Sequence, residues 1–260
     1  MLLTPQLFPQ VIPWIFLVIT IISTFVKPRL WPLLLGGTLV TGIIYNTIDI
    51  VGITCITIFL AMPFYTNKTP NKSIKAVISA LVIISCIALA AHLIPGFNNF
   101  QVLSNATKGI HSTPFSLYLN FDKPLILFIL LLLYPAILIN NKPVTLFKKL
   151  NSLRLSAIVV FSFILLFGLA TLLSLINYEP QLPSWWLLFA LNNLLLTCVV
   201  EEVFFRGFIQ QKLANLLNPL SGLIIASFLF GIAHYSGGFN YVIVATLAGF
   251  FIWFRLFTYR

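Results

Sequence analysis

The chain has 260 residues, of which 60% are hydrophobic and only 8% charged, and its net charge is +10. An ordinary soluble domain carries about 25% charged residues, so this composition excludes a soluble protein and indicates a polytopic membrane protein. The basic residues are scattered at the ends of apolar runs, as is typical of membrane topology, so we expect no nucleic-acid partner. Because helices are the default membrane-spanning structure, we expect an all-α transmembrane helical bundle.

Nine apolar runs, separated by prolines and polar residues, predict nine membrane-spanning helices. Eight is the alternative count, because only Asn46 to Asp49 separates the second run from the third. Pro13, Pro32 and Pro135 fall inside runs and predict kinks or shifted helix boundaries. The expected spans are residues 9–26, 30–46, 48–65, 76–94, 124–140, 155–176, 184–206, 219–236 and 239–257.

The basic residues also predict an orientation. Alternating the connections from an outer N-terminus places thirteen of the fifteen Lys and Arg residues inside, and only Lys108 and Lys123 outside. This asymmetry favours a multi-pass protein of the inner (cell) membrane, with its N-terminus outside and its C-terminus inside. The longest outer connection, residues 95–123, is interpreted as an interfacial loop, with a lid or a substrate entrance as the alternative.

Two adjacent carboxylates end a long apolar run in the seventh expected span, where the sequence reads Glu201-Glu202-Val203-Phe204-Phe205-Arg206. A carboxylate within a membrane span costs roughly 2.5–3.5 kcal/mol, and the chain has only five acidic residues. Glu202 and Arg206 lie one helical turn apart and can neutralise each other. That pairing leaves Glu201 as the unpaired carboxylate, which makes it the candidate catalytic residue.

A second polar position lies at a matching distance along the chain. If the helix turns back at Leu217-Asn218, Glu201 lies 16 residues before Leu217 and His234 lies 16 after Asn218. At about 1.5 Å per residue, both lie about 24 Å from the turn, so we expect them on one level. Asn193, four residues before Thr197 and eight before Glu201, extends the polar stripe on one helix face and is a candidate orienting residue.

Together, the pattern EExxxR at residues 201–206 and the pattern FxxxH at residues 230–234 resemble the first two motifs of the CAAX-protease and bacteriocin-processing family (CPBP, or Abi) of intramembrane proteases. The resemblance covers about residues 184–260. It implies that Glu201 and His234 prime an attacking water without a covalent intermediate. It also implies a peptide or lipidated-protein substrate, and membrane lipid is the other expected partner. From their spacing we interpret Glu202 and Arg206 as a structural or orienting pair.

The family pattern continues with a span carrying HxxxN, whose groups would stabilise the oxyanion, and this sequence ends at Arg260 before such a motif. We therefore expect the 260-residue chain to be at most weakly active. The family is often described as metalloproteases, yet one Glu and one His fall short of the three protein ligands of a usual catalytic zinc site. The cofactor stays unassigned: a divalent metal such as zinc is not required, and would bind at Glu201 and His234.

We therefore divide the chain into residues 1–150, transmembrane helices of unassigned role, and residues 151–260, a protease-like core. The leading hypothesis is an intramembrane endopeptidase that hydrolyses a prenylated or leader-bearing peptide. One alternative is a non-catalytic membrane protein built on the same bundle, such as a bacteriocin-immunity or scaffold protein. Another is a small transporter, because intramembrane Glu and His also serve proton relays.

Overall fold

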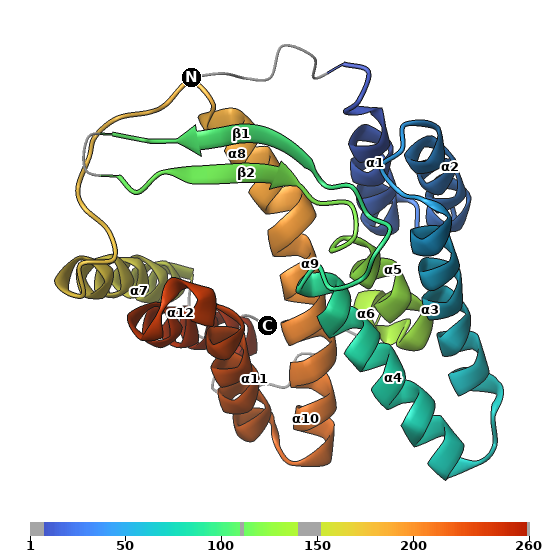
Figure 1. The fold of residues 1–260 in the computed structure, drawn as a ribbon. Coiled ribbons are helices and arrows are strands. Elements are labelled where there is room, and N and C mark those ends of the chain that lie inside the picture. The colour runs from blue at the N-terminus through green and yellow to red at the C-terminus, as the bar shows by residue number, and fades with distance from the viewer. Residues whose placement is uncertain (1–7, 110–111, 140–151, 259–260) are drawn as a thin grey trace. The chain divides into compact units, whose positions relative to one another are not determined.

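The computed structural model describes residues 8–109, 112–139 and 152–258, most of which are helical (Figure 1). The chain divides into two compact units: residues 1–139 with 181–201, and residues 140–180 with 202–260. The boundary between the units falls between the adjacent acidic residues Glu201 and Glu202. The expected division by role, at residue 150, differs from this division by packing and stays a prediction.

The first unit contains most of the elements, and local signals in the sequence set where its helices begin. Pro13 and Pro32 stand in the first turns of α1 and α2, where the missing N–H has no helical partner to lose. Asp49 caps α3, with its Oδ1 accepting from the backbone N–H of Val51 at 2.8 Å. The elements are α1 (Ile12–Val26), α2 (Trp31–Ile44), α3 (Ile50–Lys68), α4 (Lys72–Ala90), β1 (Phe100–Ala106), β2 (Phe115–Leu119), α5 (Leu125–Leu133), α6 (Ala136–Ile139), α8 (Trp186–Asn192), η1 (Asn193–Cys198) and α9 (Val199–Glu201).

The expected fifth span, residues 124–140, is not one long helix. Its first part, α5, has nine residues and is about 13 Å long, and Tyr134 and Pro135 separate it from the short α6. Residues Leu125–Leu131 are all buried. A helix that is apolar all round and buried on every side packs inside protein. The structure therefore does not contain the fifth expected span as one membrane-crossing helix. The orientation with the N-terminus outside rests on that alternation and stays a prediction.

The expected interfacial loop, residues 95–123, contains an antiparallel hairpin of β1 and β2, which lies beside α8 in Figure 1. Phe100 is paired with Leu119 in its register. The ring of Phe115 lies 5.0 Å from that of Trp185 in an edge-to-face arrangement, which attaches the hairpin to the start of α8. The fold is therefore mostly α with a two-stranded sheet, and the all-α expectation is wrong for this segment.

The second unit contains the turn that the sequence predicts. Helix α10 ends at Leu216, and Asn218 caps α11, with its Oδ1 accepting from the N–H of Ser221 at 2.9 Å. At Gly222, a Cβ would lie 2.9 Å from the carbonyl oxygen of Gln210, so this glycine allows the two helices to approach closely. The elements are α7 (Ser152–Leu172), η2 (Glu202–Gln210), α10 (Gln211–Leu216), α11 (Pro219–Ala233), η3 (Tyr235–Gly237) and α12 (Phe239–Thr258).

The surface of several helices is suited to lipid. Three helices of the described residues are long and apolar enough to cross a membrane: α3, α4 and the continuous helix Trp186–Leu216. On α7, Phe161, Phe163 and Phe167 are each more than half exposed. Such a patch is unfavourable in water and favourable against acyl chains, so the protein is a membrane protein. Its multi-pass location in the inner membrane stays a prediction.

Candidate functional site

The helix that carries the acidic motif changes its hydrogen-bonding pattern around the motif. It runs from Trp186 to Leu216, and it contains two π-helical segments, η1 and η2, on either side of Val199–Glu201. π-Helical turns are rare and are frequent at functional sites. In a π-helix the backbone hydrogen bonds join residues five apart, and not four apart as in an α-helix. The polar stripe expected from Asn193 through Thr197 to Glu201 is therefore interrupted. Asn193 and Thr197 line one cavity, which Glu201 does not line.

Glu201 is paired with a residue from a distant part of the first unit. Lys123 Nζ donates to Glu201 Oε1 at 2.7 Å, and the two side chains are only 16% and 20% exposed. The expectation that Glu201 is unpaired is therefore wrong. A largely buried carboxylate needs a compensating charge, and here it comes from the residue two positions before α5, which sequence reasoning assigned to the outer surface.

The pair also places Lys123 along the helix that carries the acidic motif, while its expected position at the outer surface stays a prediction. Glu201 lies fifteen residues after Trp186 on one helix, which is about 22 Å along its axis. Lys123 therefore lies at the level of Glu201 along this helix, about 22 Å from Trp186. The short segment between β2 and α5, residues 120–124, forms bends and a turn and places Lys123 there.

The second acidic residue of the motif forms the expected pair. Arg206 Nη1 donates to Glu202 Oε2 at 2.7 Å, within η2. The side chains of Arg206 and Glu202 are 39% and 41% exposed, so this pair is more accessible than the pair at Glu201. The ion pair is confirmed, and its orienting role in a reaction stays a prediction.

His234 lies directly after α11, as its C-terminal cap. Its Nδ1 lies 2.8 Å from the carbonyl oxygen of Phe230, the first residue of FxxxH. A carbonyl can only accept, so Nδ1 carries the proton and Nε2 of the neutral ring carries a lone pair. The ring also lies tilted against the rings of Phe230 and Tyr241, with centroids 4.4 and 5.8 Å away. The FxxxH spacing thus fixes the tautomer of the histidine.

Within the second unit, aromatic rings connect the two motifs. Phe205 and Phe230 pack edge to face with centroids 5.2 Å apart. Phe205 lies 12 residues before Leu217, and Phe230 lies 12 after Asn218. Residues at equal distance from the turn therefore face each other at this level, as the sequence predicts. The closeness of Glu201 and His234, four residues further along each chain direction, stays a prediction.

A second polar network in the first unit was missed by sequence reasoning. Asp122 is 1% exposed, and its carboxylate accepts from the backbone N–H of Lys123 at 2.9 Å and from Asn99 Nδ2 at 3.2 Å. His92 Nδ1 lies 2.7 Å from the other carboxylate oxygen. His92 follows α4 with φ +56°, a left-handed conformation common after helix ends. No local pattern joins these residues, because His92 and Asp122 are 30 positions apart.

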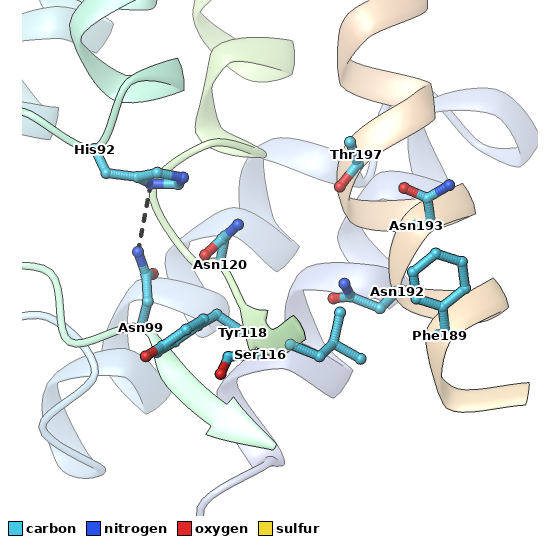
Figure 2. A pocket seen from close by; sticks show the side chains of 10 residues that line it. His92, Asn99, Ser116, Tyr118, Asn120, Phe189, Asn192, Asn193 and Thr197 are labelled. Carbon is cyan, nitrogen blue, oxygen red and sulfur yellow. Dashed lines mark hydrogen bonds between the residues drawn. The ribbon is translucent and has the colours of Figure 1, made fainter. Parts of the chain in front are cut away.

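A cavity of about 440 Å³ lies beside this network (Figure 2). On one side it is lined by His92, Asn99 and Asn120, and on the other by Asn192, Asn193 and Thr197. The described residues contain no group of three His, Cys, Asp or Glu side chains that could hold a metal. Since the neighbour of Glu201 is itself a cation, these residues do not fit a usual three-ligand zinc site, and we derive no step through a metal.

Comparison with known proteins finds a family match for the C-terminal part of the chain. Residues 183–260 match the family model of type II CAAX prenyl endopeptidase Rce1-like proteins. No curated protein and no solved structure matches the chain. The matched segment contains Asn193, the acidic motif with Glu201, and His234. The resemblance noted in the sequence is thereby confirmed: residues 183–260, which are 78 of the 260 residues, are similar to the CAAX-protease family.

Proposed function

We propose that the protein is an intramembrane endopeptidase that hydrolyses a peptide bond of a prenylated or leader-bearing substrate. The observation that carries the proposal is the state of the Glu201 carboxylate. Lys123 holds Oε1, and the described residues show no further bond to this carboxylate, so Oε2 is available to accept a proton from water. The family match supports the reaction type.

In the proposed reaction, Oε2 of Glu201 takes a proton from water as the water oxygen bonds to the scissile carbonyl carbon. The tetrahedral intermediate then collapses, the carbon–nitrogen bond breaks, and the leaving nitrogen takes the proton from Glu201. His234 Nε2 accepts a hydrogen bond from the same water and orients it. General-base catalysis of this kind typically contributes roughly 10²–10⁴ in rate. The surrounding lipid of the inner membrane would hold the lipid chain of a prenylated substrate.

The test is Glu201→Gln in the full chain, purified in detergent and given a peptide that ends in an S-farnesyl CAAX sequence. Release of the C-terminal tripeptide is followed by mass spectrometry. The substitution keeps the shape of the side chain and removes the base, so cleavage should fall by roughly 10²–10⁴. The same substitution at Glu179, outside both motifs, is the control and should leave cleavage unchanged. Equal cleavage by Glu201→Gln and the parent overturns the proposal.

A non-catalytic membrane protein is the second candidate, and the ion pair between Lys123 and Glu201 favours it. A structural role would also place Glu201 against a cation at 2.7 Å. If the ion pair is only structural, the parent chain cleaves no peptide, and a lower thermal midpoint is the only effect of Glu201→Gln. A catalytic Glu201 instead loses cleavage in a protein that still folds.

A further inference from the structure

The polar cavity of the first unit is lined by neutral groups. Ten residues line it, and none of them is Asp, Glu, Lys or Arg. Its one imidazole, that of His92, is already bound to the buried carboxylate of Asp122. A phosphate, a carboxylate or an ammonium group would find no opposite charge in this lining. The cavity is therefore suited to an uncharged polar ligand.

The hairpin side of the cavity presents the edge of a strand. Three consecutive residues of β2, Ser116 to Tyr118, line it. Alternate side chains of a strand point to opposite faces, so three in succession line a cavity only if the strand edge borders it. β2 pairs with β1 on one edge, and in the described residues Ser116 to Tyr118 make no other backbone hydrogen bond. Such an edge can accept a further extended strand.

The helix side of the cavity presents side-chain amides. Asn192 is 9% exposed, and its buried Oδ1 has no hydrogen-bond partner among the described residues. In Figure 2 the amide of Asn192 points into the space that Asn120 borders from the other side. A buried oxygen without a partner is costly, and an N–H donor from a ligand would remove that cost. The N–H of a peptide unit can donate to the oxygen of an asparagine amide, and its C=O can accept from the amide nitrogen.

Both sides of the cavity continue to the proposed catalytic carboxylate. On the helix, Thr197 lines the cavity four residues before Glu201, a distance of about 6 Å along the axis. On the other side, Asn120 lines it three residues before Lys123, which binds Glu201 at 2.7 Å. An extended peptide advances about 3.3 Å per residue, so about two residues separate the end of the cavity from this carboxylate.

We infer that the cavity binds an extended, uncharged peptide segment of the substrate, which adds as a third strand to β2 and donates a backbone N–H to Asn192. This inference rests on the proposed function, since it makes the cavity the cleft that delivers a peptide to Glu201. It names a binding surface and a mode of peptide binding that the family match, which begins at residue 183, does not give for β2. The segment is recognised through its backbone, and its side chains are restricted only in that they carry no charge.

The experiment measures binding to the full-length Glu201→Gln chain, so that cleavage does not interfere. The probe is a fluorescent peptide that ends in an S-farnesyl CAAX sequence, followed by anisotropy. Two analogues carry N-methyl groups on backbone amides, one before and one after the farnesylcysteine. N-methylation removes the donors and blocks strand pairing, so one analogue should bind at least roughly tenfold more weakly. Equal binding of both analogues and the parent peptide overturns the inference, as does failure of the peptide to bind.

Asn192→Leu tests the helix side of the cavity. It should weaken binding roughly 3- to 10-fold while leaving the thermal midpoint unchanged or higher, because it removes a buried oxygen without a partner. A purely structural Asn192 would instead lower the midpoint. Asn215→Leu, the same change at an exposed site on α10, is the control and should bind as the parent does. Parent-like binding by Asn192→Leu also overturns the inference.

The two proposals fail separately. If Glu201→Gln still cleaves, yet N-methylation and Asn192→Leu weaken binding, the cavity binds peptide and the catalytic assignment is wrong. If Glu201→Gln abolishes cleavage while both peptide analogues bind as tightly as the parent peptide, the catalytic assignment stands and the inference about the cavity falls.

Discussion

Lys123 and Glu201 are 78 positions apart in the chain, and their side chains meet at 2.7 Å in the first unit. This pair joins the N-terminal helices, for which the sequence suggests no role, to the first residue of the acidic motif. The family match begins at residue 183, so it includes Glu201 and does not include Lys123. The lysine is thus a feature of this chain that the match alone would not reveal.

Lys123→Met should reduce both stability and cleavage. The change leaves the Glu201 carboxylate without its donor in a setting where it is only 20% exposed. A hydrogen bond to a charged group contributes roughly 1.5–3 kcal/mol, so the thermal midpoint should fall by several degrees. Cleavage should fall further than the folded fraction, because Oε1 is no longer held in place.

A double-substitution cycle isolates the pair. Lys123→Met combined with Glu201→Gln removes both charges, so its loss of stability should be smaller than the sum of the single losses. Additive losses would show that the two side chains do not interact in the folded protein. Lys123→Arg keeps the positive charge and should retain most of the thermal stability.

The elements that were predicted from the sequence depend on local signals. The turn at Leu217 and Asn218 follows from a capping asparagine and a proline, and the pair of Glu202 and Arg206 follows from their spacing. Pro135 likewise interrupts the helical run where expected. These features need only a few neighbouring residues, so a sequence pattern is enough to find them.

The features that were missed depend on distant contacts. The run that contains α5 is apolar whether lipid or protein surrounds it, so hydropathy cannot distinguish a span from a buried helix. The partners of Glu201 and His92 come from positions 78 and 30 residues away. The π-helical segments around Glu201 are not visible in a pattern of 3.6 residues per turn, which describes only the regular α-helix.

Two substitutions at His234 distinguish the roles of its two ring nitrogens. His234→Asn places an amide nitrogen near the position of Nδ1, where it can still donate to the carbonyl of Phe230, and it removes Nε2. This variant should fold and lose roughly 10²–10⁴ in cleavage rate, as expected for a group that acts on the attacking water. His234→Gln places a polar atom near Nε2 and should retain more activity. Full activity in His234→Asn would contradict a role for Nε2.

Glu202→Gln should have a small effect on stability. Its pair with Arg206 is about 40% exposed on both sides, and accessible ion pairs typically contribute about 0–1 kcal/mol. Cleavage per folded molecule should therefore stay close to that of the parent, if the residue only orients the helix. Thermal unfolding and cleavage are measured on the same preparation. A loss of cleavage as large as that of Glu201→Gln would give Glu202 a direct part in the reaction.

The last prediction concerns the distance between Glu201 and His234. Phe205 and Phe230 contact each other at equal distance from the turn, and Glu201 and His234 lie four residues further along their segments. Packed helices have axes about 8–10 Å apart, so we expect the two Cα atoms within about 12 Å. Cysteines at 201 and 234, in a chain whose Cys55, Cys86 and Cys198 are replaced by serine, should react with a short bifunctional crosslinker. Cysteines at 205 and 230 provide the positive control, because those side chains are in contact. If only the control pair crosslinks, Glu201 and His234 do not share a site, and the water-activating role of the histidine is lost with it.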